Sequence, residues 1–186
     1  DARRRDFAIN ALYLDGTGNL YDPVGGLADL RAGRVRFIGS AETRIGEDAL
    51  RLLRFYRFYA AYGKGEADGD ARAACRKLAV LLAGLSAERI QAELLKLLAA
   101  KNPVPALKIM GEDGVLAAIL PEAVRLDRLS RLLPIEPEPD ALRRLAALVQ
   151  VDRAGATALA KRLRLANDQR ARLVALAAPA WPIDLG

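Results

Sequence analysis

The chain has 186 residues, which suits one or two domains with a sizeable core. Its 29 Lys and Arg against 23 Asp and Glu give a net charge of +6, which favours an anionic partner, nucleic acid first. The lack of histidine excludes a His-based metal site or catalytic triad. The single Cys75 excludes an intrachain disulfide and suits a reducing cytoplasm. No apolar run reaches the ~18 residues of a membrane helix.

The first 42 residues predict a hairpin followed by a connector. Alternating hydrophobicity over residues 7–14 is typical of a strand, residues 15–19 form a turn with two glycines, and residues 20–23 predict the returning strand. A lone hairpin is marginally stable, so we expect it to complete a sheet whose other strands lie upstream in a longer protein. The glycine-rich residues that follow predict a structured connector with one short helix near residues 27–31.

Helical periodicity dominates the rest of the chain. Helices are predicted at residues 48–62, 71–83, 86–99, from 102–103 onward, and at 114–120, 122–133, 140–149, 153–163 and 168–177. Three prolines in residues 134–139 predict a linker, and Trp181 is expected to pack the C-terminal tail onto the helices. The expected fold is mainly α, with a remnant at 1–42, a helical neck at 43–110 and a helical body at 111–186.

The stretch RIGEDALRLLRFYRF, residues 44–58, places two acids before three arginines. On a helix that starts at Asp48, the side chains of Asp48, Arg51 and Arg54 form a polar ridge along neighbouring faces. A guanidinium beside a carboxylate can read a base edge, because the arginine donates and the carboxylate accepts from an exocyclic amino group. Spacing alone favours an ordinary salt bridge between Asp48 and Arg51 on a solvated face. Arg57, further round the helix, is expected to pair with an acid.

Four blocks in order carry a resemblance to a known family: RRDFAINALYLD, YDPVGGLADLRAGRVRFIG, RIGEDALRLLRFYRF and SAERIQAELLKLL. They resemble those of bacterial-type (class II) CCA-adding tRNA nucleotidyltransferases and the related poly(A) polymerases. The blocks span residues 4–98, and the remaining half matches only as a generic helical tail. One departure is Ala8, where the family often has threonine. The resemblance implies that the hairpin is left from an α/β nucleotidyltransferase head.

The resemblance also implies a nucleotide-binding set, which comprises Arg4, Arg5, Asp6, Asp48, Arg51 and Arg54. In that set the first two arginines face the triphosphate, the aspartate after them bonds the ribose hydroxyl, and Arg54 reaches the triphosphate. Asp48 and Arg51 imitate a Watson–Crick edge that accepts C or A, so that the protein itself acts as the template.

A supporting set follows from the same blocks and comprises Asn10, Asp22, Gly25, Gly26, Asp29, Glu47, Arg89 and Glu93. Asn10 is expected to pin the strand, and Glu47 to cap the start of the reading helix. The block at residues 22–30 is expected either to couple head and neck or simply to form a turn. Arg89 and Glu93, with Lys96, either brace the reading helix or form a solvated ladder.

Basic residues near the end of the chain, Lys161, Arg162 and Arg164, are candidates for contact with an RNA backbone. For any one of them, a solvated helix face is the favoured interpretation.

No catalytic residue and no metal ligand is expected in this chain. In the family, Mg²⁺ is held by an Asp-x-Asp strand pair upstream of the Arg-Arg-Asp block, whereas Asp68 and Asp70 here fit turn and N-cap chemistry. The chain alone is therefore expected to be inactive. We expect it to be part of a cytoplasmic nucleotidyltransferase that adds CCA to tRNA 3′ ends from CTP and ATP. The alternatives are a poly(A) polymerase of the same family and a non-catalytic helical RNA-binding module.

Overall fold

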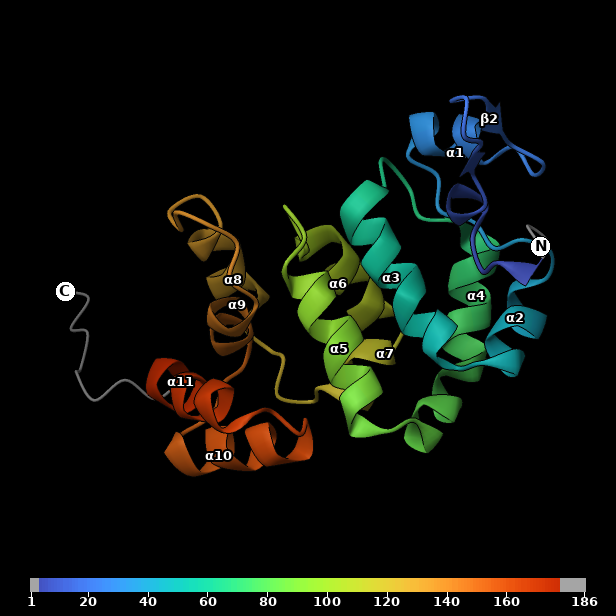
Figure 1. Cartoon of the computed structure of the whole chain (residues 1–186). Helices are drawn as coiled ribbons and strands as arrows, with labels where there is room; N and C mark the ends of the chain where they lie inside the picture. The colour runs from blue at the N-terminus through green and yellow to red at the C-terminus, as the bar shows by residue number, and fades with distance from the viewer. Residues whose placement is uncertain (1–3, 178–186) are drawn as a thin grey trace.

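The computed structural model describes residues 4–177, so the expected packing of Trp181 lies outside the described residues. These residues form a mainly α structure with one small antiparallel hairpin near the N-terminus, which confirms the predicted fold class (Figure 1). The hairpin pairs β1 (Tyr13–Leu14) with β2 (Leu20–Tyr21). None of the helices within residues 4–177 has the length and hydrophobicity of a membrane span.

The helices follow in chain order. They are η2 (Ala8–Asn10), α1 (Gly26–Ala32), α2 (Ala41–Glu47), α3 (Leu50–Tyr62), α4 (Gly69–Leu78), η3 (Ala79–Gly84), α5 (Ala87–Leu98), α6 (Val104–Glu112), α7 (Val115–Ile119), α8 (Leu126–Leu132), α9 (Ala141–Leu148), α10 (Arg153–Arg162) and α11 (Asn167–Ala177), where η marks a 3₁₀ helix.

The predicted first strand was wrong over most of its length. Residues 8–10 form a 3₁₀ turn, and only Tyr13–Leu14 pairs with the returning strand. The reason is local: the Asp6 carboxylate accepts hydrogen bonds from the Phe7 backbone N–H at 3.0 Å and from the Asn10 amide at 3.1 Å. Such side-chain bonds offer the backbone an alternative to a ladder. Phe7 keeps one bridge, to Phe37.

Three helix predictions also need correction. The sequence analysis missed α2, which begins after Ser40, whose hydroxyl accepts the Thr43 N–H at 3.3 Å. The predicted helix over residues 71–83 is α-helical only to Leu78 and continues as η3. The helix predicted from residue 122 begins at Leu126, because Ala123 instead bridges Val149.

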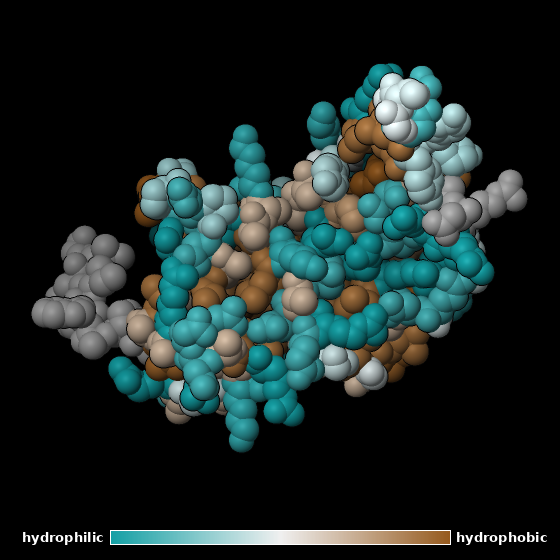
Figure 2. Space-filling model, in the orientation of Figure 1, coloured by the Kyte–Doolittle hydropathy of each residue, from teal (hydrophilic) through white to brown (hydrophobic). Residues whose placement is uncertain are grey.

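Helix α3 lies at the centre of the molecule and packs against α5 and α6 (Figure 1). Its buried stripe includes Leu52, Phe55 and Tyr56, none of which is exposed to solvent. Helices α8 to α11 form a group on the other side of α5, where α9 packs against α5. The main hydrophobic cluster is continuous from Phe7 to Leu173. Hydrophilic side chains cover most of the face shown in Figure 2. The division into three domains stays a prediction.

A buried carboxylate holds α3 in place from the side of α4 and α6. Asp113, just after α6, has a fully buried side chain. It accepts hydrogen bonds from the Tyr56 hydroxyl on α3 at 2.9 Å and from Arg72 and Arg76 on α4 at 2.8 Å each. Burial opposes ionisation of Asp113, but the donors, Arg72 first, hold its pKa below the usual value. Burial raises the pKa of Tyr56, which therefore remains a donor.

This carboxylate should make stability depend on pH. The pKa of Asp113 is lower in the folded chain than its ordinary value of 3.8. Its ionised form therefore stabilises the fold above that pH, and this contribution is lost as the pH falls toward the folded pKa. We expect Asp113→Asn to lower the free energy of unfolding by about 3 kcal/mol at neutral pH. The part of the stability that the wild type loses as the pH falls below about 4 should be missing from urea melts of the variant.

The matched control is Asp70→Asn, at an exposed position in the first turn of α4. It should change stability by no more than about 0.5 kcal/mol at either pH. A wild-type melting profile for Asp113→Asn would contradict the role given to this carboxylate.

Candidate nucleotide-binding site

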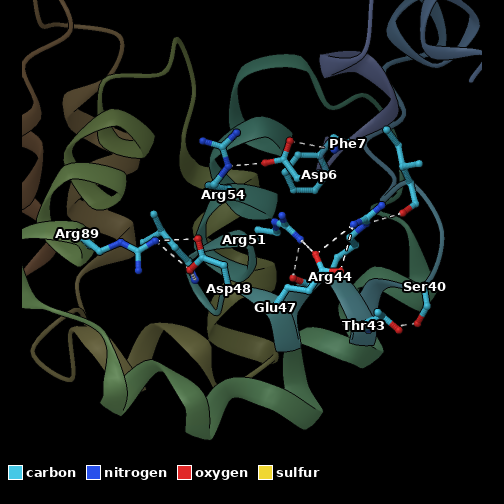
Figure 3. A network of polar contacts seen from close by, with 12 residues as sticks. Asp6, Phe7, Ser40, Thr43, Arg44, Glu47, Asp48, Arg51, Arg54 and Arg89 are labelled. Carbon is cyan, nitrogen blue, oxygen red and sulfur yellow. Dashed lines mark hydrogen bonds and ion pairs between the residues drawn. The ribbon is translucent and has the colours of Figure 1, made fainter. Parts of the chain in front are cut away.

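The candidate site is built around the corner between α2 and α3 (Figure 3). Helix α2 ends at Glu47, and Asp48 has extended backbone angles of φ −156° and ψ 108°. The Asp48 carboxylate accepts the backbone N–H of Leu50 at 3.1 Å, at the start of α3. The prediction that one helix starts at Asp48 was therefore wrong, because an aspartate at this point bonds a backbone donor that a helix start leaves unsatisfied.

Arg51, in the first turn of α3, faces the end of α2 (Figure 3). Its Nη1 donates to the Arg44 carbonyl at 3.0 Å and pairs with the Glu47 carboxylate. These contacts leave Nε and Nη2 without a hydrogen-bond partner among residues 4–177. Because Nε–H and one Nη2–H point the same way, Arg51 still offers a planar fork of two donors.

Glu47 does not cap the start of α3, as the sequence analysis expected, because it is the last residue of α2. A carboxylate at a helix C-terminus is disfavoured by the helix dipole. Two guanidinium groups offset this effect: hydrogen bonds from Arg51 and then Arg44 hold the pKa of Glu47 below its usual value. Glu47 therefore positions Arg51 across the corner.

The Asp48 carboxylate pairs with Arg89 of α5, and the salt bridge to Arg51 that spacing favoured is not formed. Arg89 Nη2 lies 2.9 Å from Oδ1 and 2.8 Å from Oδ2. Both side chains are more than a third exposed, so this pair contributes at most about 1 kcal/mol. Within residues 4–177, Oδ2 accepts only this one bond and can accept another. The backbone N–H of Arg51 donates to the Asp48 carbonyl at 3.0 Å, so both residues share one turn.

Asp6 and Arg54 contact each other across the junction between the N-terminal segment and α3 (Figure 3). Burial opposes ionisation of Asp6, but hydrogen bonds from Arg54 and Asn10 hold its pKa below the usual value. Asn10 therefore fixes this carboxylate rather than a strand. The Arg54 guanidinium also lies 5.3 Å from the centre of the Phe58 ring. A direct ion pair thus joins two residues that were predicted to contact different parts of a nucleotide.

Arg4 and Arg5 are exposed at the edge of this junction. The Arg5 guanidinium lies 6.0 Å from the centre of the Tyr13 ring, at the outer limit of a cation–π contact. Neither arginine has an ion pair within residues 4–177, so both remain available to an anion.

The glycine-rich connector is tightly packed. The Asp22 carboxylate accepts the backbone N–H groups of Gly26 at 2.7 Å and Leu27 at 2.9 Å, and these bonds lower its pKa. Gly25 has φ 78°, in the left-handed region that favours glycine. A Cβ on Gly26 would lie 2.1 Å from the Ala8 carbonyl oxygen. Close approach of α1 to η2 therefore requires glycine at residue 26.

Helix α1 is fastened to both of its neighbours. Asp29 is buried and pairs with Arg36 at 2.6 Å, while Arg36 also donates to the Val24 carbonyl at 2.7 Å. The Gly33 carbonyl accepts the backbone N–H of Lys64, just after α3, at 2.9 Å. The block at residues 22–30 therefore forms a turn, and Gly33 just after α1 contacts the residue range that follows α3, while the coupling of head and neck stays a prediction.

Helix α5 braces α3 through a second ion pair. Glu93 is 4% exposed, and its carboxylate lies 2.7 Å from Arg57 Nε, which confirms the prediction that Arg57 pairs with an acid. Lys96 lies at 3.8 Å from the same carboxylate, and the Arg57 guanidinium lies 4.3 Å from the Phe58 ring centre. Because Glu93 is buried, a solvated ladder does not describe these residues.

Comparison with known proteins places this geometry in a family. The family model "Poly A polymerase head domain" matches residues 1–36, and "Probable RNA and SrmB- binding site of polymerase A" matches residues 68–126. The mouse mitochondrial CCA tRNA nucleotidyltransferase 1 is 36% identical over 177 residues, covering 91% of this chain and 40% of the mouse protein. The CCA-adding enzyme of Geobacillus stearothermophilus is 39% identical over 132 residues, covering 71% and 32%.

The chain belongs to the family of CCA-adding enzymes and poly(A) polymerases. A solved structure of the Bacillus stearothermophilus CCA-adding enzyme in complex with CTP has a TM-score of 0.78 and 31% identity, covering 95% of this chain and 45% of that one. The Thermotoga maritima CCA-adding enzyme complexed with tRNA, at 21% identity and a TM-score of 0.70, shows the shared fold. The chain spans 27% of the length of the zebrafish mitochondrial CCA tRNA nucleotidyltransferase 1 and 40% of the length of the mouse protein.

The three basic residues proposed for RNA contact in this family member differ in their surroundings. The Arg162 guanidinium donates to the Ile119 carbonyl at 2.8 Å and to Glu122 at 2.6 Å, so it ties α10 to the end of α7. Lys161 is exposed and has no ion pair within residues 4–177. Arg164 is exposed and lies 4.0 Å from Glu88.

Sequence reasoning missed Arg44 and the helix that carries it. The available signal was Ser40 followed by Glu42, a typical helix start. The contact from Arg51 to the Arg44 carbonyl had no signal, because it joins two helices across a corner whose angle the sequence does not specify.

The close approach at residue 26 can be tested directly. We expect Gly26→Ala to destabilise the protein by about 1–3 kcal/mol, because its methyl group would meet a backbone oxygen that cannot move aside cheaply. Gly46→Ala is the matched control, since Gly46 is also helical and a Cβ added there would have nothing within 4 Å. It should be neutral or stabilising by up to about 1 kcal/mol. Equal melting temperatures for the two variants would contradict the tight contact between α1 and η2.

Proposed function

We propose that this chain is the nucleotide-selecting and RNA-binding part of a tRNA nucleotidyltransferase that adds CCA to tRNA 3′ ends from CTP and ATP. One observation carries the proposal: the free donor fork of Arg51 and the open acceptor of Asp48 belong to one turn at the α2–α3 corner. The names of the mouse and Geobacillus relatives support it.

The donor and acceptor at this corner match the edges of C and A. Both bases carry an exocyclic amino group beside a ring nitrogen acceptor, whereas U and G carry a carbonyl beside a ring N–H. Oδ2 of Asp48 would accept from the amino group, and the Arg51 fork would donate to the acceptors next to it. U or G would place acceptor against acceptor and donor against donor, which leaves polar groups unpaired in the site.

The rest of the nucleotide would lie toward the N-terminal segment. Arg4 and Arg5, exposed and without ion pairs among the described residues, would meet the triphosphate, as arginine forks suit phosphate. Arg54 would reach the triphosphate only through its end nitrogens, because its Nε bonds Asp6. Asp6 would bond the ribose hydroxyl with the acceptor capacity that its three donors leave.

Mg²⁺ is the metal that the resemblance implies for this reaction. Within residues 4–177 no group of three or more acidic, cysteine or histidine side chains could hold a metal ion, so the residues present do not form such a site. The inactivity of the chain by itself and its cytoplasmic location both stay predictions, and some relatives carry mitochondrial names.

A poly(A) polymerase is the second candidate, because both matching family models carry that name. A poly(A) polymerase would have the same α2–α3 corner. Incorporation of ATP but not CTP by the full-length protein would favour this second candidate.

Replacing Asp48 or Arg51 should change the selectivity for nucleotides more than it changes the stability of the fold. In the full-length protein we expect Arg51→Ala and Asp48→Ala each to reduce discrimination against UTP and GTP by roughly ten- to a hundredfold, the value of a good bidentate base contact. Each variant should lose no more than about 2 kcal/mol of stability, the cost of a lost helix-start bond or of one partly exposed ion pair. Incorporation kinetics with each of the four nucleotides, beside a thermal melt, measure both effects.

The control for this pair is Arg131→Ala, which removes an exposed arginine paired with Asp127 on α8. It should leave selectivity unchanged. Arg57→Ala is unsuitable, because it would leave the buried Glu93 without its partner. Intact selectivity in both Asp48→Ala and Arg51→Ala would refute the base-reading proposal.

The affinity for RNA should fall as salt rises, and the steepness of the fall should depend on how many cations contact phosphate. We expect Lys161→Ala and Arg164→Ala each to reduce the slope of log affinity against log salt by about 1. Arg162→Ala should act instead on stability, since its guanidinium is held by Ile119 and Glu122. Arg31→Ala, an exposed cation on α1, serves as control and should leave the slope unchanged. Binding titrations with tRNA between about 50 and 200 mM salt give the slopes, and a slope unaffected by Lys161→Ala and Arg164→Ala would exclude these residues.

A further inference from the structure

A deeply buried cation lies at the end of α5 opposite to Arg89. Arg144 of α9 is 2% exposed, and all three nitrogens of its guanidinium have a partner. Nη1 donates to the carbonyls of Leu98 and Ala100, at 2.5 Å each, and Nε donates to Glu136 at 2.6 Å. The two carbonyls belong to the C-terminal end of α5, where helix carbonyls have no partner within the helix and a cation is favoured.

The acid comes from the segment that the sequence analysis predicted as a linker. Glu136 lies in it between Pro134 and Pro137, and its side chain is 2% exposed. Proline fixes the backbone φ angle, so this segment loses little freedom when Glu136 is held in place. The proline-restricted segment therefore places the buried Glu136 carboxylate beside Arg144.

Arg144, with its guanidinium held by Glu136, joins two parts that have different expected tasks. Helix α5, about 18 Å long at 1.5 Å per residue, carries Arg89 near its start and meets Arg144 at its end. Through Glu93 it holds Arg57 of α3, and through Arg89 it contacts Asp48 at the reading corner. Helices α8 to α11, here called the body helices, carry Lys161 and Arg164.

Apart from the apolar packing of α9 on α5, the other polar links between α5 and the body helices are weak. Glu88 and Arg164 are 4.0 Å apart and both mostly exposed, and the amides of Gln91 and Gln169 are 3.5 Å apart. A separate junction ties the body helices to the end of α7, where Arg162 holds the Ile119 carbonyl. The Arg162 junction and the contact of Arg144 with α5 are thus polar attachments of the body helices at separate places, beside the apolar packing of α9 on α5 and of α8 on α6.

We propose that the Arg144–Glu136 pair positions the body helices relative to the nucleotide corner, so that RNA held on the body presents its 3′ end to Asp48 and Arg51. The role in presenting RNA to the corner rests on the proposed function, whereas the role in holding the body helices against α5 does not. A buried ion pair often contributes little net stability compared with well-packed apolar residues. A guanidinium bonded to one carboxylate and two carbonyls fixes the orientation of α9 relative to the end of α5, whereas an apolar pair does not.

The test uses the full-length protein with the double substitution Arg144→Met/Glu136→Leu, which removes both charges and retains bulk. Spin labels on Val80→Cys in η3 and Ala158→Cys in α10, both exposed positions, report the distance between neck and body by pulsed electron resonance. Cys75 is fully buried and should not take a label. We expect a broader distance distribution in the double variant than in the wild type.

Kinetics on the same variant test the second half of the proposal. The KM for tRNA should rise by about tenfold or more, because RNA held on misplaced body helices can no longer contact the corner at the same time, and the gain from simultaneous binding is lost. The KM for CTP should stay within about twofold, because the corner itself is unchanged. The control is Arg128→Met, which removes an arginine that donates to the Ala146 carbonyl within the body helices. It should change neither the distance distribution nor either KM.

Each outcome decides a separate point. An unchanged distance distribution would overturn the proposal, and so would a broadened distribution with an unchanged KM for tRNA. Should the double variant fail to fold, Arg144→Lys replaces it: a lysine keeps the charge but lacks the planar fork of donors, so the same broadening and KM shift are expected. If the wild-type protein adds no nucleotides to tRNA, the proposed function fails and so does the positioning role, while the distance measurement still decides the mechanical link.

Discussion

Burying a carboxylate between two helices is costly unless a partner offsets its lost hydration, and Glu93 imposes this constraint on α3 and α5. Its partner Arg57 is fixed at 2.7 Å, which sets how far α3 can slide or turn against α5. Asp113 imposes the same constraint from the side of α4 and α6. With α3 held between two buried acids, its first turn can project Arg51 toward the corner without help from a ligand.

The ion pairs around the corner differ in how readily they can exchange partners. The Asp6 side chain is 7% exposed and accepts bonds from three donors, so breaking its pair with Arg54 would leave a desolvated charge. The pair between Asp48 and Arg89 is open to water, where exchange costs little. Asp6 therefore suits a fixed anchor between the N-terminal segment and α3. Asp48 suits a group that must release or share a partner each time a base arrives.

Local and periodic features were predictable from the sequence, and the contacts across helices were not. Repeating apolar residues correctly indicated α3, α5 and α9, because helical spacing alone determines which face is buried. The start of α3 was misplaced because Asp48 fits a helix by composition, while its carboxylate bonds the backbone of Leu50. The partner of Asp48 is 41 residues away, a separation at which no spacing rule applies.

The family blocks identified which residues gather at the corner, but charge counting could not show which cations face RNA. A net charge of +6 does not distinguish Arg144, buried against carbonyls, from Lys161, exposed to solvent. Arginine fills the first role because one guanidinium can bond a carboxylate and two carbonyls at once. A cation used in this way no longer attracts phosphate. The number of phosphate contacts is therefore set by the cations that the fold leaves unpaired, and net charge overstates the basic surface that the body helices can offer to RNA.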